Sequence, residues 1–518
     1  MTKPASLEWR AETACAEGTA RRRRAVPRRR YGVRVYGHGA AGALLMMLTL
    51  GVAGCVTVGP DYVAPAGDAP ARWSRLDETG GSMIGTGAPG DISRWWRGLH
   101  DPLLSELVER ALRASPDLRS AQARLREARA RLVIAGAARF PGVDASASAS
   151  RSHAGGREEG GATRNFFSAG FDAGWELDVF GGVRRGVEAA RADLEASAAG
   201  LDDTRVSLAA EVALDYVQVR ALQIRIGIAR DNLASQTETL QLTEWRAQAG
   251  LASSQDVEQA RSNREQTRAQ IPALETSLAT TETSLDILLG DPPGTLHARL
   301  AAPADLPAVP ARIAVGIPAD ALRQRPDVRA AERRLAAETA RVGVAEAARY
   351  PTFALSGSIG VEALTLGGLG EGGAGTSSLL AGVTAPIFHA GRLRAQVGVQ
   401  DAVREQAEVA YRQTVLAALQ DVENALVALA RSREREQALT IAAASARSAA
   451  VLARDRYSAG LIDFQSVLDT ERNVLAVEDN LASTRADGVL ALIRLYKALG
   501  GGWSPQPAGE AAGGRASP

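Results

Sequence analysis

Four short segments of the chain alternate between apolar and small or polar residues, which is the pattern of a β-strand. The clearest segment is 167–179, where one face carries Phe167, Ala169, Phe171, Ala173, Trp175, Leu177 and Val179. We expect strands at about 143–153, 164–180, 352–362 and 377–388, paired across glycine-rich loops at 154–163 and 365–376. Their length suits tilted strands of a membrane barrel, and four strands of a soluble sheet are the alternative.

Two very long stretches carry apolar residues at every seventh position, which predicts coiled-coil packing of helices. In the first stretch the repeat consists of Val212, Val219, Ile226, Leu233 and Leu240. The helices are expected at 116–139, 183–249, 253–289, 326–349, 391–458 and 463–499. A helix of about 67 residues spans ~100 Å. We therefore expect two shorter helices, stacked end to end, to match each long one: 253–289 with 326–349, and 463–499 with 116–139.

The chain contains one unit twice, at an offset of 210 residues. Pro116, Asp117, Arg139 and Pro141 correspond to Pro326, Asp327, Arg349 and Pro351, and the motif around Gly250 recurs around Gly460. A period this long indicates a duplicated fold, since solenoid repeats are much shorter. The expected organisation is a signal peptide at 1–54, an N-terminal segment at 55–102, a first repeat at 103–290, a linker at 291–317, a second repeat at 318–500 and a tail at 501–518.

The N-terminal region has the features of a secretory signal. Residues 21–37 are strongly basic, residues 39–53 are apolar or small, and Val52-Ala53-Gly54 precedes Cys55. This site resembles a bacterial lipobox, so we expect cleavage before Cys55 and attachment of lipid to its thiol, which is the nucleophilic group. A plain membrane anchor or a chance cysteine are the alternatives. Val at position 56 favours, by the same resemblance, sorting to the outer membrane.

Composition and charge narrow the possible functions. The formal net charge of +1 gives no reason to expect nucleic acid. After Cys55 no run of about 18 apolar residues occurs, so any further membrane crossing must use strands. Because four strands cannot close a barrel and open edges are not tolerated in lipid, the sequence predicts an oligomer.

No pattern of catalytic or metal-binding residues stands out. The five histidines, at positions 38, 100, 153, 297 and 389, are scattered without metal-ligand spacing. Gly181-Gly182 lies between a predicted strand and helix, but it lacks the phosphate-binding fingerprint. We therefore predict a protein that is not an enzyme and that carries no cofactor except the covalent lipid on Cys55.

Several motifs in their order along the chain resemble those of TolC-like outer-membrane factors, in particular the NodT/OprM branch of efflux lipoproteins. They are Cys55-Val-Thr-Val-Gly-Pro-Asp-Tyr62, Trp95-Trp96, Asp101-Pro102, Trp175-Glu-Leu-Asp-Val-Phe-Gly181, Ala385-Pro-Ile-Phe388, Arg456-Tyr-Ser-Ala-Gly460 and Leu495-Tyr-Lys-Ala-Leu-Gly-Gly-Gly-Trp503. The resemblance implies a mainly α fold with a transmembrane β-barrel portion. Three copies would supply a 12-stranded β-barrel in the outer membrane and a 12-helix α-barrel across the periplasm.

The same resemblance implies a function and partners. The homotrimer would be the outer-membrane channel of a tripartite efflux pump for drugs or other small molecules, lipid-anchored and extending into the periplasm. A periplasmic adaptor (membrane fusion protein) and an inner-membrane pump of the resistance–nodulation–division class would be its partners. Open alternatives are the exit duct of a type I protein-secretion system, a soluble periplasmic adaptor and a periplasmic enzyme on a helical scaffold.

The resemblance also assigns a periplasmic aperture. The breaks at Gly250 and Gly460 would be hairpin tips, and Asp256 and Asp469 would line the closed opening with Tyr457. Three aspartates from three subunits would favour cations. The chain departs from the family pattern at Ser466 and Ile462, and Asp463 would compensate. The alternative for each acid is a solvated carboxylate that is favoured at a helix N-terminus.

Overall fold

The structure is a computed structural model that describes residues 57–65, 69–74, 84–85, 92–154, 162–310 and 313–503. These residues all belong to one compact unit, Val56–Pro518. The expected signal peptide, Cys55 and residues 504–518 lie outside the described residues.

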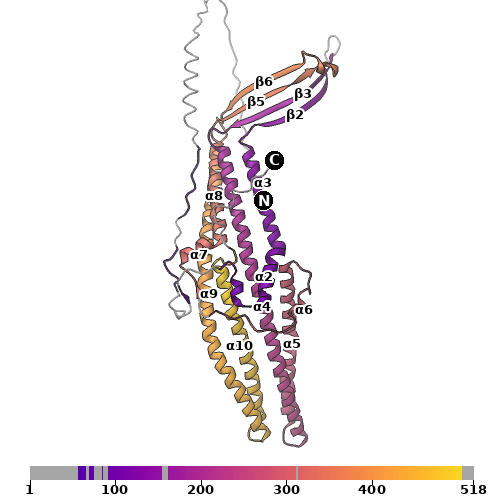
Figure 1. Cartoon of the computed structure of the whole chain (residues 1–518), viewed down its shortest axis with the longest axis vertical. Coiled ribbons are helices and arrows are strands. Elements are labelled where there is room, and N and C mark those ends of the chain that lie inside the picture. Colours follow the sequence, from indigo (N-terminus) through magenta and orange to yellow (C-terminus); the bar gives the residue numbers. More distant parts are fainter. Residues whose placement is uncertain are drawn as a thin grey trace, which may run out of the picture. The chain divides into compact units, whose positions relative to one another are not determined.

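Helices make up most of the described unit, with one four-stranded sheet (Figure 1). The helices are α2 (Pro102–Ala114), α3 (Pro116–Ala137), α4 (Gly182–Gln248), α5 (Ser254–Leu289), α6 (His297–Leu300), α7 (Pro318–Gln324), α8 (Pro326–Ala347), α9 (Arg392–Ser458) and α10 (Phe464–Ala498), with 3-10 turns at Trp95–Leu99 and Gly367–Gly370. The strands of the sheet are β2 (Gly142–Ala154), β3 (Ala162–Leu177), β5 (Thr352–Ala363) and β6 (Gly375–Thr384), and β1 (Ile84–Gly85) pairs with β4 (Ile313–Ala314).

The duplication seen in the sequence is present in the backbone. The helices α3 and α8, and likewise α4 and α9, begin 210 residues apart and have equal lengths of 22 and 67 residues. The glycines that start α4 and α9 also agree, since Gly181 and Gly391 both have φ of 83°. Equal local sequence has therefore produced equal helix limits in both halves.

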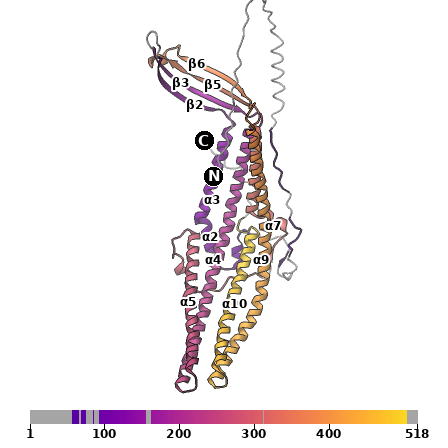
Figure 2. The same ribbon diagram turned by 180° about the vertical axis from the view of Figure 1, so that it is seen from behind.

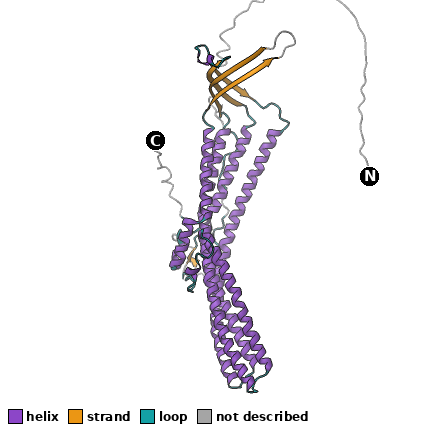
Figure 3. Cartoon of the chain, turned by 90° about the vertical axis from the view of Figure 1, so that its right-hand side faces the viewer, coloured by secondary structure: helices purple, strands orange, loops and turns teal. Residues whose placement is uncertain are grey.

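The sheet joins the two halves of the chain. Its order is β2-β3-β5-β6, with every neighbouring pair antiparallel, so β3 of the first half pairs with β5 of the second (Figure 1). Figure 3 shows these strands together beyond one end of the helices. Large apolar side chains on it stay exposed, among them Phe171, Ile359 and Leu379. The fourth strand ends at Thr384, earlier than the expected 388, because Pro386 has no N–H group for the ladder.

The long helix α4 packs against five other helices, namely α2, α3, α5, α8 and α10, and α9 packs mainly against α8 and α10. Figure 2 shows α10 beside both α4 and α9 at the end of the unit opposite the sheet. No helix in the described residues is both long enough and apolar enough to cross a membrane.

The expected end-to-end stacking of helices is wrong in its partners. A Cβ built on Gly290, after α5, would lie 3.2 Å from the Pro116 ring at the start of α3. At the end of α10, a Cβ on Gly500 would lie 3.3 Å from Arg325 Cα, next to α8, and Arg325 donates to the Ala498 carbonyl at 3.0 Å. The stacked helices thus belong to the same repeat. In the first repeat the end of α5 lies against the junction of α2 and α3, and in the second repeat the end of α10 lies against the junction of α7 and α8.

The main core lies at mid-length, where the 3-10 turn Trp95–Leu99 meets the C-terminal end of α10. Trp95 stacks on Tyr496 with ring centroids 5.3 Å apart, and Trp96 lies edge-on to Trp95. Fully buried leucines of α2, α4, α9 and α10 complete the cluster, including Leu107, Leu208, Leu429 and Leu492. The Trp-Trp motif therefore fixes the chain ends onto the helices.

Candidate functional site at the hairpin turns

The two long helices each reverse direction through a glycine at the end opposite the sheet. Gly250 and Gly460 both adopt φ of 74°, a left-handed conformation that glycine allows without steric cost. In each turn the following leucine N–H bonds back to an arginine carbonyl: Leu251 to Arg246 at 2.7 Å, and Leu461 to Arg456 at 2.8 Å. These bonds satisfy carbonyls that a helix end otherwise leaves free.

Asp256 is a helix-capping residue of α5. Its carboxylate accepts from the Ser253 backbone N–H at 2.9 Å, while the Ser253 hydroxyl accepts from the Asp256 N–H at 3.1 Å. The two residues form a capping box, which satisfies two donors of the first turn. The geometry is that of the alternative considered for this acid, a carboxylate placed at a helix N-terminus.

Asp463 and Asp469 differ in the hydrogen bonds that their carboxylates accept. Asp463 caps α10 and accepts from both the Ser466 N–H, at 2.9 Å, and the Ser466 hydroxyl, at 2.6 Å. These hydrogen bonds favour the charged form and lower the pKa of Asp463. Asp469 is exposed and accepts from the Gln465 amide at 2.8 Å. No hydrogen bond between described residues joins Asp256, Asp463 and Asp469 to one another.

Tyr457 is buried, only 4% exposed, in a cluster that includes Phe464, Val467 and Leu468 of α10. Its ring lies 5.4 Å from that of Phe464, and its buried hydroxyl has no hydrogen-bond partner. In the single chain, therefore, the side chain fills the space between the hairpins. Ile462 packs against the same cluster, and the Ser466 hydroxyl donates a hydrogen bond to Asp463.

Arg246 connects the two hairpins and was not identified from the sequence. Its guanidinium lies over the Tyr457 ring, 4.6 Å from the centroid, and donates to the carbonyls of Tyr457 and Ser458 at 2.9 and 3.1 Å. A cation at the C-terminus of α9 is favourable, because the helix dipole is negative there. A basic residue in the last turn of α4 was a visible signal, but nothing local indicates that it serves the other hairpin.

Replacing Arg246 by alanine is expected to loosen the contact between the hairpins by about 1–2 kcal/mol, from the lost cation–π contact and carbonyl bonds. The midpoint of thermal unfolding of the purified protein should fall. The matched control is Arg456→Ala, because Arg456 is the equivalent residue of the second repeat and is exposed. Equal losses in the two variants would contradict a specific role for Arg246.

No group of three or more His, Cys, Asp or Glu side chains in the described ranges could hold a metal ion. The site therefore consists of two capped turns, one buried tyrosine and an arginine that bridges them. These groups can hold two helix pairs together and present carboxylates at their ends.

Comparison with known proteins places this architecture in a family. The family model described as outer membrane efflux protein matches the chain twice, at residues 107–291 and 317–501, ranges close to the two expected repeats. Among curated relatives, the pyoverdine export outer membrane protein OpmQ of Pseudomonas putida is 36% identical over 468 residues, covering 89% of this chain and 97% of the relative. Nodulation protein T of Rhizobium leguminosarum bv. trifolii is 32% identical, covering 88% and 96%.

Solved structures agree with this assignment. The outer-membrane channel OprN superimposes on this chain with a TM-score of 0.81 at 37% identity, covering 86% of this chain and all of that one. The predicted TolC-like fold of two duplicated halves is thus confirmed, together with the resemblance to the NodT/OprM branch. The chain is a member of the outer membrane efflux protein family, a family of channel proteins.

Proposed function

We propose that three copies of this chain form the lipid-anchored exit duct of a tripartite efflux pump. A periplasmic adaptor and an inner-membrane pump of the resistance–nodulation–division class would dock at the hairpin turns. Membership of the efflux family supports a channel in the outer membrane. Beyond family membership, we propose the trimer, the lipid on Cys55 and the two partners.

The proposal rests mainly on the two unpaired edges of the four-stranded sheet. Within the described residues β2 and β6 each pair on one side only, which leaves two free edges. Free strand edges tend to pair with another chain, and in lipid they must do so. Val143 and Val383 share a face of the sheet with Phe171, Ile359 and Leu379 in the register of the strands, and all five side chains are exposed. Pairing β6 of one copy with β2 of the next would remove both edges and place these side chains against lipid.

The position of the residues just after Cys55 supports a lipid anchor at that cysteine. Arg185 of α4 donates to the carbonyls of Val58 and Gly59 and to the carboxylate of Asp61, at 3.2, 3.2 and 2.7 Å. The Val58 N–H bonds to the Phe180 carbonyl, just after β3. The chain is thus fixed at Val58 beside the foot of the sheet, a position from which a lipid on Cys55 would enter the same membrane.

For the aperture we propose Asp469 as the principal carboxylate, with Asp256, Asp463 and Tyr457 in supporting roles near Gly250 and Gly460. Asp256 and Asp463 already accept hydrogen bonds in their caps. Asp469 is exposed and keeps more of its acceptor capacity. Three such carboxylates in one ring would favour cations at the narrow end of the duct.

The alternative is the same duct in a type I protein-secretion system. A relative named for the export of pyoverdine favours a small-molecule cargo. Genes for a pump and an adaptor beside this one would support efflux, whereas a gene for an ABC exporter would support protein secretion.

The test is the mass of the protein purified from detergent-solubilised outer membranes, before and after denaturation. We expect a trimer whose subunits each carry added lipid mass, and Cys55→Ser should remove that mass. Cys15→Ser is the matched control and should change nothing, because Cys15 precedes the expected cleavage site. A lipid-free monomer in the soluble periplasmic fraction would overturn the proposal.

A further inference from the structure

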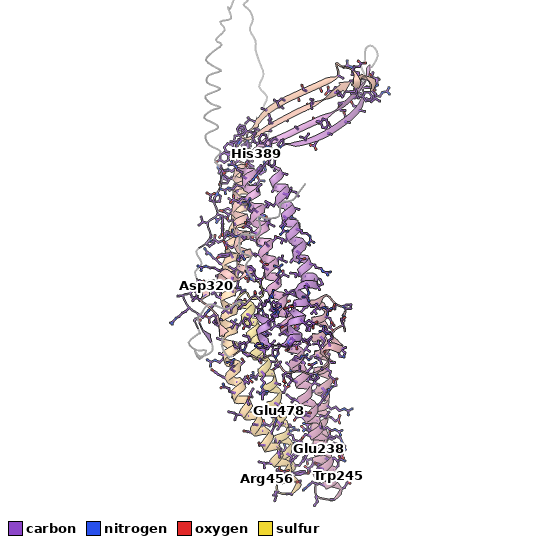
Figure 4. The ribbon with its side chains drawn as sticks, in the orientation of Figure 1. Glu238, Trp245, Asp320, His389, Arg456 and Glu478 are labelled. Atoms are coloured by element: carbon purple, nitrogen blue, oxygen red, sulfur yellow. The ribbon has the colours of Figure 1, made fainter. Side chains whose placement is uncertain are left out.

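The contact between the two hairpins is polar where α4 meets α10. From residue 232 to the turn on α4, and from the turn to residue 478 on α10, the buried polar side chains are Asn232, Gln236, Thr239, Thr243, Glu471 and Glu478. Apolar residues usually fill such positions of a coiled coil, because buried polar groups reduce stability. Figure 4 labels Glu478 on α10, on the sheet side of the turns marked by Trp245 and Arg456. We call this contact the polar seam.

Glu478 forms the first of two equivalent layers in the polar seam. One carboxylate oxygen accepts from Asn232 of α4 at 3.2 Å, and the other accepts from Arg447 of α9. Both oxygens of this buried acid thus have a partner. A charge that is paired and hydrogen-bonded in this way is tolerated in a protein interior.

Glu471 forms the second layer, seven residues nearer the turns along each of the three helices. One carboxylate oxygen accepts from the Thr239 hydroxyl of α4, and Arg454 of α9 takes the place of Arg447. Here the arginine Nε stops 3.9 Å from the carboxylate, beyond hydrogen-bond distance. The second oxygen of Glu471 and the Nε of Arg454 are both buried without a partner. The layer repeats the design of the first one but is incompletely bonded.

We propose that Glu471 is a proton-sensitive latch between the two hairpins, and that its protonation tightens the packing of α10 against α4. A protonated carboxyl keeps an acceptor for Thr239 and removes from the interior a charge that Arg454 compensates only from 3.9 Å. The groups that face this carboxyl are Arg454 from α9 and the neutral Thr239 from α4, while Arg472 of its own helix bonds to Asn263 of α5.

The direction of the pH response follows from burial. Desolvation raises the pKa of Glu471, and the Thr239 hydrogen bond and the Arg454 charge act against it with smaller effect. The closed seam therefore binds a proton more tightly than an opened seam in which the carboxyl meets water. Closed packing gains stability as pH falls through the raised pKa, and it loses that gain as pH rises.

A single reporter cysteine can measure opening of the seam in the full-length trimer in detergent. Gln236→Cys places a thiol at a position only 2% exposed, and the replaced amide makes no hydrogen bond of its own. Labelling of the protein without the reporter is subtracted first. The remaining rate of labelling by a thiol reagent is then divided, at each pH, by the rate at which the same reagent labels a free thiol in solution. The normalised rate should be lower at pH 5 than at pH 8, by about tenfold for each unit of pKa shift.

Two glutamine variants in the reporter background separate the latch from a general polar effect. Glu471→Gln should label slowly at both pH values, since it imitates the protonated acid. Glu478→Gln is the matched control from the fully bonded layer, and it should keep the pH response. A normalised rate that does not vary with pH, or a response that persists in Glu471→Gln, would overturn the proposal.

A third variant tests the latch without changing the acid. Thr239→Val removes the hydrogen bond that favours the charged carboxylate, so the midpoint of the pH response should move to higher pH. If Glu471→Gln does not assemble, the shift of the midpoint in Thr239→Val is the test of the proposal. A midpoint that stays in place or moves to lower pH would contradict the assignment to Glu471.

Discussion

Alanine at Gly360 is expected to separate β3 from β5 and to destabilise the protein by about 1–3 kcal/mol or more. Gly360 lies opposite Gly170 in the register of these strands. A Cβ on Gly360 would lie 2.6 Å from the Ala169 carbonyl oxygen and 2.9 Å from Gly170 Cα, both of them backbone atoms that cannot turn aside. This pair of strands joins the two repeats, so we expect the substitution to reduce assembly of the proposed trimer as well as the stability of the single chain.

The measurement is the yield of the proposed trimer together with the midpoint of thermal unfolding. Gly174→Ala is the matched control, because Gly174 lies on β3, in the same pair of strands, and a Cβ there would meet nothing within 4 Å. Alanine in a strand interior is slightly favourable relative to glycine, so this control should retain or gain stability. Equal behaviour of the two variants would show that the strands can move apart without cost.

The second large effect is expected for Asp101→Ala, with a loss of about 2–4 kcal/mol, because it removes a helix cap and the charged acceptor of a hydrogen bond from a buried tyrosine. One Asp101 oxygen caps α2 by accepting from Leu104 N–H at 2.9 Å, and the other accepts from the Tyr216 hydroxyl at 2.7 Å. Arg220, 3% exposed, donates to that hydroxyl at 3.2 Å and to the Ala302 carbonyl at 2.7 Å.

Removal of Asp101 would leave the tyrosine hydroxyl and the buried guanidinium with less compensation. Burial, followed by the hydrogen bond to Asp101, raises the pKa of Tyr216 to about 12, so the hydroxyl remains a donor at every pH that the protein meets. Denaturant unfolding is the measurement, with Asp117→Ala as control, since Asp117 is likewise an acid at the start of a helix but is exposed. Asp101→Asn, which keeps an acceptor, should lose less than Asp101→Ala; the reverse order would argue against the network.

Much of the fold could be predicted because its elements are defined by local patterns. Heptads predicted α4 within one residue at each end, and alternation found all four strands of the sheet. The last strand was predicted too long, since alternating residues continue past Pro386 where the ladder cannot. The 210-residue repeat reappears in equal helix limits and in the equal φ of Gly250 and Gly460.

The candidate site was less accessible to sequence reasoning. The turns and the acids near them could be located, but the sequence did not distinguish a capping carboxylate such as Asp256 from a free one such as Asp469. Capping depends on the residue at which a helix begins and on the orientation of one side chain, and the pattern of apolar residues fixes neither of them to within one residue. Arg246 was overlooked because its partners Tyr457 and Ser458 are more than 200 residues away.

By itself, the sequence determined six of the helices, the four strands of the large sheet, the duplication and the positions of the turns, because these depend on neighbours within one or two turns of chain; it did not predict α2, α6, α7, β1 and β4. Only the tertiary structure decided which helices share a contact. A heptad pattern states that a helix has an apolar face, but it does not name the helix that covers it. For that reason the end-to-end partners were predicted wrongly, and the polar seam with Glu471 became visible only when α4, α9 and α10 were placed side by side.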